Sequence, residues 1–408
     1  MKKNDRQDMH RVKKVRLTFK ELVDWVYKCI GCAACQGLYR TQWPNQTYDR
    51  TCPRMDQWEF ESATPGGLMW LLRGNLEGIV PMNTKTLEQL YSCSLCKACE
   101  FQCYGDHGEH ITEIFLAVRE KQIEQGNIPP KVKDFLENIL KHGNPWGEAR
   151  SKRGEWAKAI EGVRKYKFDD EFLYYVGCEG SYDTFGQRMA RNLAELLVKA
   201  GFSFGILGEQ EICSGNDVRL LGEKGLFEML VEKNMKTFKD LGVKKIITLS
   251  PHDYNAFKNA YPEYGDMPEV IHYTQLLHEL IKNGKLKVSS FSAKVTYHDP
   301  CFLGRYNNIY DEPREILKSI PGIELIEMKR NRENAFCCGG GGGNFYFGFL
   351  NGKARIREAY DTGAEILAVA CPSCGTMLED ALKENGLEDK ISIMSIPEMV
   401  KKTLLSGT

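Results

Sequence analysis

Apolar side chains recur at helical spacing on both sides of the first group of cysteines. The positions are Phe19, Leu22, Val23 and Val26 before the cysteines, and Ile111, Ile114, Phe115 and Val118 after them. A repeat of three to four positions predicts amphipathic helices that pack their apolar faces inward. The region from residue 1 to about 125 is therefore expected to be mainly helical.

Downstream, short apolar runs of the kind that form buried strands alternate with helical spacing. The runs lie near 172–176, 245–249, 294–298 and 365–370, and the first leads into Met189, Leu193, Leu196 and Leu197 at helical spacing. Alternating strands and helices predict parallel α/β sheets. Between the two regions, prolines and glycines in a polar stretch indicate a connector, from about 126 to 165.

The part of the chain after the connector reads as an internal duplication. The first copy contains FLYYVGC, EICSG and KKIITLSPHD, and the second contains KVTYHDPC, AFCCGG and EILAVACPSC. The first step spans 35 positions in one copy and 36 in the other, from Cys178 to Cys213 and from Cys301 to Cys337. Repeats of this length indicate duplicated domains. We expect the first repeat to span 166–288 and the second to span 289–408.

Charge and hydropathy exclude several classes of protein. The chain has 408 residues, and its 55 basic side chains balance 55 acidic ones. A net charge of zero argues against a nucleic-acid binder, which normally carries a basic surplus. No apolar stretch is long enough to span a bilayer, and the opening MKKNDRQDMHRVKKVRL lacks the apolar core of an export signal. We therefore expect a cytoplasmic protein, with membrane contact only through a partner.

The fifteen cysteines carry most of the chemical information. Eight lie before residue 104, five lie after residue 300, and only Cys178 and Cys213 stand apart. In a chain without an export signal, clustered thiols at short spacing are more often metal ligands than disulfides.

The N-terminal cysteines form two motifs that suit iron–sulfur cubes. The first motif is C-x2-C-x2-C at Cys29, Cys32 and Cys35, with Cys52 and Pro53 later, and the second motif is C-x2-C-x2-C-x3-C at Cys93, Cys96, Cys99 and Cys103. In two-cluster ferredoxins the fourth thiolate of a cluster comes from the other motif. We therefore assign one [4Fe–4S] cluster to Cys29, Cys32, Cys35 and Cys103 and another to Cys93, Cys96, Cys99 and Cys52. Zinc is disfavoured, because four-cysteine zinc sites usually consist of two separated C-x2-C pairs.

The first motif departs from the usual ferredoxin spacing. A segment of sixteen residues, QGLYRTQWPNQTYDRT, separates Cys35 from Cys52. The segment could shield a cluster or dock a partner, but a tolerated surface loop is the simpler interpretation.

Five cysteines of the second repeat come from three separate loops. They are Cys301, the adjacent pair Cys337 and Cys338, and the C-x2-C pair Cys371 and Cys374. Neighbouring parallel strands would bring these loops together, and adjacent cysteines suit metal bridging better than a strained vicinal disulfide. The order of these cysteines resembles the CCG domain of heterodisulfide reductases, as does YHDPCFLGR at 297–305. With the two-cluster region ahead of it, the chain is similar to the fused D-type subunit.

The resemblance implies a noncubane [4Fe–4S] cluster on these five cysteines, with a plain cubane on four of them as the alternative. Gly339 and Gly340 are expected to let the backbone approach this cluster and to donate N–H groups to sulfur. His298 and Arg305 flank the loop of Cys301. They could stabilise thiolate or substrate charge, or have an ordinary structural role.

The first repeat departs from the family pattern. Cys213 and Ser214 replace the cysteine pair, and Ser250, Pro251, His252 and Asp253 replace C-P-x-C. Because serine is a far weaker iron ligand than a thiolate, we expect no noncubane cluster there. A mixed metal site of Cys178, Cys213, His252 and Asp253 is chemically feasible but less expected than simple loss of the site.

The expected fold is α+β and multidomain, with a helical ferredoxin-like domain (1–125) followed by two α/β CCG domains. The resemblance implies an iron–sulfur subunit that relays electrons within a multi-subunit oxidoreductase. A flavoprotein is the expected partner, including the electron-bifurcating kind that serves benzoyl-CoA reduction. The alternatives are a catalytic heterodisulfide or thiol–disulfide reductase, which the damaged first repeat puts in doubt, the iron–sulfur subunit of a glycolate, lactate or glycerol-3-phosphate dehydrogenase, and a non-redox protein with structural metals.

Overall fold

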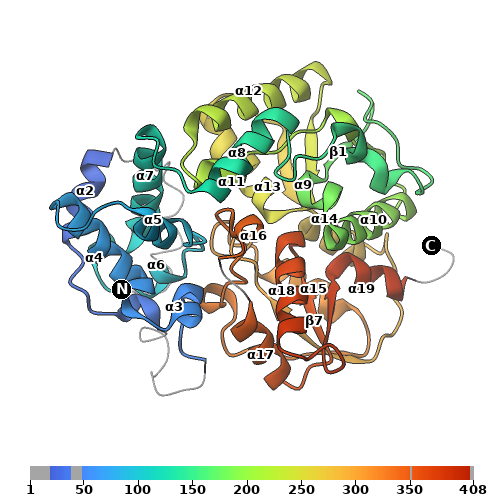
Figure 1. The fold of residues 1–408 in the computed structure, drawn as a ribbon. Helices are drawn as coiled ribbons and strands as arrows, with labels where there is room; N and C mark the ends of the chain where they lie inside the picture. Colours follow the sequence, from blue (N-terminus) through green and yellow to red (C-terminus); the bar gives the residue numbers. More distant parts are fainter. Residues whose placement is uncertain (1–18, 38–47, 350–351, 405–408) are drawn as a thin grey trace.

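The computed structural model describes residues 19–37, 48–349 and 352–404 (Figure 1). A helical N-terminal part lies beside two units that each contain a small parallel sheet. Most of the segment between Cys35 and Cys52, at positions 38–47, lies outside the described residues, and so does the charged opening of the chain. The mixture of helices and parallel sheets agrees with the expected fold class.

The N-terminal part is built from helices, as the apolar spacing predicts. They are α2 (Phe19–Tyr27), α3 (Pro53–Trp58), α4 (Pro65–Leu76), α5 (Thr84–Tyr91), α6 (Ala98–Gln102) and α7 (Ile111–Glu124). α2 packs on α7, and the apolar positions Leu22, Val26, Ile114 and Phe115 are buried. Burying each such side chain contributes about 2 kcal/mol, so this contact anchors the region that carries the first cysteines.

The segment expected to be a connector contains secondary structure of its own. It forms α8 (Pro130–His142) and a 3-10 helix at Arg150–Ala157. A proline begins α8, and Gly143, in the left-handed conformation with φ of 74°, ends it. The ring of Phe135 on α8 lies 5.0 Å from that of Tyr346. The segment is therefore folded against the second repeat.

Each repeat forms a four-stranded parallel sheet with the same strand order. The first sheet runs β2-β1-β3-β4 and the second runs β6-β5-β7-β8. The strands are β1 (Phe172–Tyr175), β2 (Phe204–Gly205), β3 (Lys245–Thr248), β4 (Glu269–His272), β5 (Ala293–His298), β6 (Ile323–Leu325), β7 (Ile366–Val369) and β8 (Ser392–Ser395). The common order agrees with the duplication that the cysteine spacing predicts.

Helices flank both sheets and connect their strands. In the first repeat they are α9 (Gly177–Tyr182), α10 (Thr184–Lys199), α11 (Asn216–Leu220), α12 (Lys224–Asp240), α13 (Pro251–Asn255) and α14 (Tyr273–Lys282). In the second they are α15 (Asp311–Ser319), α16 (Asn344–Phe347), α17 (Lys353–Asp361), α18 (Pro372–Glu384) and α19 (Ile396–Thr403). No helix within the described residues has the length and apolarity that a membrane span requires.

The two repeats pack closely against each other where α10 meets α18. A Cβ atom at Gly375 would lie 2.0 Å from Cε1 of Phe185, so the absence of a side chain permits this approach. Arg188 forms an ion pair with Glu379 at 2.6 Å across the same contact. The contact holds the cysteine-bearing loops of the two repeats in a fixed relation.

Candidate functional site

The five cysteines of the second repeat are all buried and lie at one edge of its sheet. Because β5 and β7 are neighbouring parallel strands, the loops that follow them leave the sheet on the same side. The cysteines on these loops, together with the pair in the loop before α16, form what we call the C-terminal thiol site: Cys301, Cys337, Cys338, Cys371 and Cys374.

Contacts between sulfur atoms connect all five thiols of this site. Sγ of Cys338 lies 3.3 Å from Sγ of Cys374. The thiol of Cys337 hydrogen-bonds with those of Cys301 and Cys338. Cys374 also hydrogen-bonds with Cys371. A connected group of buried, unbridged thiols fits a multinuclear iron site, because thiolates are the usual ligands of iron–sulfur clusters.

The first repeat contributes to the electrostatics of the C-terminal thiol site. Burial opposes ionisation of Cys371, but hydrogen bonds with Cys374 and His252 outweigh it and lower the pKa of Cys371 to about 6. His252 belongs to the first repeat, where Oδ2 of Asp217 lies 3.3 Å from its Nδ1. Sequence reasoning noted His252 within the damaged motif but did not predict that it would reach the other repeat.

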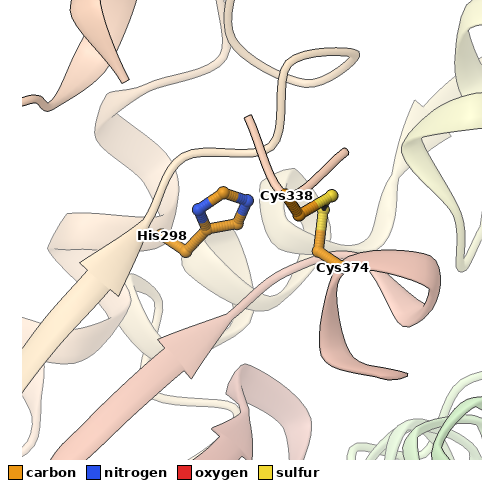
Figure 2. Close-up of side chains that lie close together, drawn as sticks. All are labelled: His298, Cys338 and Cys374. Atoms are coloured by element: carbon orange, nitrogen blue, oxygen red, sulfur yellow. Dashed lines mark hydrogen bonds between the residues drawn. The ribbon is translucent and has the colours of Figure 1, made fainter. Parts of the chain in front are cut away.

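His298 also lies against the C-terminal thiol site. His298, Cys338 and Cys374 place ligand atoms within 4.8 Å of one another, and this is the only such group of three among the residues that the structure describes. Figure 2 shows the imidazole of His298 at the end of β5. Cys338 and Cys374 lie on the side of the ring that points away from this strand. Nδ1 of His298 accepts a hydrogen bond from Nε of Arg355 at 3.1 Å.

The two N-terminal motifs share an unusual backbone conformation. In the first motif Gly31 and Ala33 have φ of 70° and 61°, and in the second Leu95 and Lys97 have φ of 50° and 64°. Residues other than glycine rarely adopt this left-handed conformation, so its recurrence at matching positions indicates functional loops. Turns of this kind can direct several N–H groups to one side of the loop, which favours an anionic group there.

Cys103 and Cys52, which the sequence assigns as fourth ligands, each lie near the other motif. Burial raises the pKa of Cys35, and the nearby thiol of Cys103 raises it further, with a smaller contribution from Cys52. Burial raises the pKa of Cys52 to about 12, and its neighbouring thiols are Cys93 and Cys96. These neighbourhoods are compatible with the expected exchange of fourth ligands between the two motifs.

The second N-terminal motif touches the C-terminal thiol site. The thiol of Cys96 hydrogen-bonds with that of Cys337, and Oγ of Ser94 lies 3.7 Å from Sγ of Cys337. Nε of Arg305 donates to the carbonyl oxygen of Cys96 at 2.6 Å. Two groups of thiols that are far apart in the sequence therefore meet at one interface, and Arg305 lies at that interface.

The glycine run after the cysteine pair approaches both groups of thiols. The N–H of Gly339 donates to Sγ of Cys337 at 3.3 Å, a bond of the kind that the sequence predicts. A Cβ atom at Gly340 would lie 3.8 Å from Sγ of Cys338. Gly341 faces the other way, because a Cβ atom there would lie 2.7 Å from the carbonyl oxygen of Ser94. The glycine run therefore also packs closely against the second N-terminal motif.

Sequence reasoning missed a buried arginine that ties the second N-terminal motif to its surroundings. Arg119 on α7 is fully buried. Its guanidinium donates to the carbonyl oxygens of Cys93 at 2.5 Å, Leu90 at 2.8 Å and Leu220 at 2.9 Å. No local sequence pattern marks this residue, because its partners are backbone atoms of separate elements.

The first repeat keeps the geometry of the second with different atoms. The N–H of Gly215 donates to Sγ of Cys213 at 3.3 Å, the same distance as in the second repeat. The thiol of Cys178 hydrogen-bonds with that of Cys213. Oγ of Ser214 donates to Oδ1 of Asp253 at 2.5 Å, in place of the sulfur contact between the C-x2-C loop and the cysteine pair. A hydroxyl and a carboxylate therefore contact each other where the second repeat has thiols.

Arg153 adds a positive charge to this altered site. Its Nη2 lies 3.4 Å from Sγ of Cys178 and donates to Glu211 at 3.0 Å. A hydrogen bond from Cys213 and then the charge of Arg153 lower the pKa of Cys178 against the effect of burial. His252, which a mixed metal site would need, forms its hydrogen bonds with Asp217 and the C-terminal thiol site instead.

Comparison with known proteins identifies the family. The CCG cysteine-rich domain family matches residues 172–258 and 295–379. The D-type subunit of dihydromethanophenazine:CoB–CoM heterodisulfide reductase from Methanosarcina barkeri is 30% identical over 351 residues, which cover 82% of this chain and 83% of that subunit. The chain belongs to the CCG-domain family that includes this D-type subunit. The two matched ranges of this CCG-domain chain each fall within one repeat, and they end before the last strand of each sheet, β4 or β8.

Other relatives are longer than this CCG-domain chain. The probable iron–sulfur-binding oxidoreductase FadF of Bacillus subtilis is 39% identical over 335 residues, and the EtfAB:quinone oxidoreductase of Syntrophomonas wolfei is 37% identical over 336 residues. The alignments cover 79% and 78% of this chain and 47% of each relative, so the chain spans about half their length. The crystal structure of a hypothetical protein from Helicobacter pylori matches 100% of this chain and 76% of its own with a TM-score of 0.53 at 12% identity, which shows the fold alone.

Three observations support iron–sulfur binding. The chain belongs to a cysteine-rich family, its relatives include proteins named as iron–sulfur oxidoreductases, and its C-terminal thiols are buried in mutual contact. Together these observations support a redox role for the chain.

Proposed function

We propose that this CCG-domain chain is an iron–sulfur electron-transfer subunit of a larger oxidoreductase. It relays electrons between two [4Fe–4S] cubanes in the N-terminal part and one [4Fe–4S] cluster, of the noncubane type, at the C-terminal thiol site. The observation that carries the proposal is the contact between the two groups of thiols, where Oγ of Ser94 lies 3.7 Å from Sγ of Cys337 and Nε of Arg305 donates to the carbonyl oxygen of Cys96.

The chain's own residues are suited to hold such clusters. When bound, clusters of this kind accept and donate one electron at a time. Burial of the C-terminal thiols excludes water, and the N–H of Gly339 stabilises negative charge on sulfur. The proposed ligand sets are Cys29, Cys32, Cys35 and Cys103 for the first cubane, Cys93, Cys96, Cys99 and Cys52 for the second, and the five cysteines of the C-terminal thiol site for the third cluster.

The outer end of this relay is the first N-terminal motif. Cys32 is exposed, and the neighbouring Ile30 and Trp70 are 79% and 49% exposed. Ile30 and Trp70 line the same surface groove, together with Gly31 and Ala33 of the motif. An apolar surface around an exposed cluster ligand suits a transient redox partner. We propose a flavoprotein as this partner, which is in keeping with the relative named EtfAB:quinone oxidoreductase.

The geometry favours a relay over disulfide reduction, although one relative is named as part of a heterodisulfide reductase. The first repeat holds the bonded pair Ser214 and Asp253 and the charge of Arg153 where a second thiol site would lie. A single C-terminal cluster would face a disulfide substrate from one side only. The relay needs one such thiol site and a contact of that site with the second N-terminal motif, and the described residues provide both.

Metal analysis of the anaerobically purified chain tests the proposal. We expect about twelve iron and twelve sulfide per chain, as three [4Fe–4S] clusters require. Cys374→Ser should lower the iron content by up to about four, whereas Cys178→Ser, a matched control in the first repeat, should leave it unchanged. A colourless preparation, or zinc in place of iron, would contradict the proposal.

A further inference from the structure

His298 has one ring nitrogen with a partner and one without. The side chain is 1% exposed, so neither nitrogen reaches solvent. Nδ1 lies 3.1 Å from Nε of Arg355, whereas Nε2 has no hydrogen-bond partner among the described residues. Nε2 lies on the side of the ring that faces Cys338 and Cys374 (Figure 2). A buried nitrogen without a partner costs free energy, and at His298 this nitrogen also faces two thiols to which the proposed function assigns a cluster.

Arg355 determines which ring nitrogen carries the proton. Its Nη1 donates to the carbonyl oxygen of Arg330 at 2.7 Å and to Glu358 at 2.9 Å, so the guanidinium is fixed in place. Arginine is always protonated and has no acceptor atom, so Nε must donate and Nδ1 of His298 must accept. In the neutral imidazole the proton therefore resides on Nε2.

The same hydrogen bond keeps this ring neutral. Nδ1 accepts from Nε of Arg355 and therefore carries no proton of its own. His298 thus presents a neutral N–H group to the C-terminal thiol site.

We propose that His298 donates its Nε2–H to a sulfur atom of the cluster at the C-terminal thiol site and does not bind iron. The inference rests on the proposed function, because it requires a cluster at this site. A metal ligand needs a free lone pair on nitrogen, and the hydrogen bond from Arg355 leaves none on either nitrogen. Hydrogen bonds to cluster sulfur raise the reduction potential, so His298 is a positioning residue that makes this cluster easier to reduce.

Two substitutions of His298 distinguish a hydrogen-bond donor to the cluster from a ligand of iron. His298→Leu removes the N–H group, whereas His298→Gln places an amide N–H near the position of Nε2. His272→Leu is the matched control, because His272 is another fully buried histidine with an unpartnered Nε2, located in the first repeat. Iron content, EPR-monitored midpoint potentials and the coupling of exchangeable protons in pulsed EPR are measured on the full-length holoprotein.

We expect all three variants to retain the wild-type iron content. In His298→Leu, the midpoint potential of the C-terminal cluster should shift to more negative values and one exchangeable proton coupling should disappear, and His298→Gln should restore most of both. An iron loss in His298→Leu equal to that in Cys374→Ser would overturn the inference in favour of a ligand. An unchanged potential and coupling would overturn it in favour of a purely structural role. Absence of iron from the wild-type site would instead refute the proposed function.

Discussion

At the level of single residues, the thiols of the second N-terminal motif are accompanied by buried positive charge. Arg54, Arg119 and Arg305 are all buried, and each lies near thiols of this motif. A cluster held by four thiolates is negatively charged, and a nearby guanidinium stabilises its reduced form because the local dielectric constant is low. Buried arginines would therefore make the cluster of the second N-terminal motif easier to reduce.

Replacing Arg305 by glutamine should lower the reduction potentials of the clusters at Cys96 and Cys337. A unit charge about 5 Å away at an effective dielectric constant of about 20 contributes about 3 kcal/mol, or on the order of 100 mV for one electron. Arg305→Lys keeps the charge and should cause a smaller shift. Potentiometric titration followed by EPR measures these shifts. Identical potentials in the three proteins would leave Arg305 with a structural role alone.

Arg153→Met should destabilise the first repeat by about 3 kcal/mol, because it leaves the charge of Glu211 buried without its partner. Glu211 is 2% exposed, and its other partners are the backbone N–H groups of Val176 and Gly177. The double variant with Glu211→Met should regain part of the lost free energy of unfolding. Anaerobic denaturant titration followed by circular dichroism compares the proteins. A double variant that is less stable than Arg153→Met would count against this account.

The cysteines could be predicted from the sequence, and the arginines around them could not. The spacing of Cys93 and Cys96 indicates a shared loop directly, because both residues belong to one short motif. Arg119, in contrast, reaches the carbonyl of Leu220 across 101 positions. A side chain whose partners are backbone atoms of distant elements leaves no local pattern. The contact of His252 with the second repeat could not be predicted from the sequence for the same reason.

At the level of elements, apolar runs predict the two central strands of each sheet, but no run marked the edge strands β2, β4, β6 and β8. Prolines and glycines predict less. The runs at 172–176 and 245–249 correspond to β1 and β3. The prolines and glycines that suggested a connector include the residues that begin and end α8. Such residues mark helix boundaries as well as loops, so composition alone cannot separate the two cases.

Gly341→Ala tests the contact between the glycine run and the second N-terminal motif. The new Cβ atom would lie 2.7 Å from the carbonyl oxygen of Ser94, which must move. We expect a loss of about 2 kcal/mol in stability and an altered EPR signal of the C-terminal cluster at full iron content. Gly225→Ala is the control, since its nearest neighbour, a side-chain oxygen of Glu223, lies at 3.5 Å. Thermal unfolding that is equal in both variants would show that the contact tolerates a side chain.

At the level of the whole molecule, a duplicated unit has diverged while its backbone geometry persisted. Both repeats keep the strand order and the 3.3 Å bond from a glycine N–H to the first cysteine of the pair. Only the second repeat keeps all its thiols, and this is the repeat whose Cys337 meets Cys96 of the N-terminal part. The second N-terminal motif therefore adjoins the repeat that keeps its thiols.

In the proposed relay, the clusters of the second N-terminal motif and of the C-terminal thiol site lie close enough to exchange electrons. EPR of the fully reduced, anaerobically prepared chain, compared with Cys371→Ser, tests it most directly. We expect the N-terminal signals of the wild type to be broadened by magnetic interaction with the C-terminal cluster, and to sharpen in the variant. A wild-type spectrum whose N-terminal signals are identical to those of the variant would contradict the account.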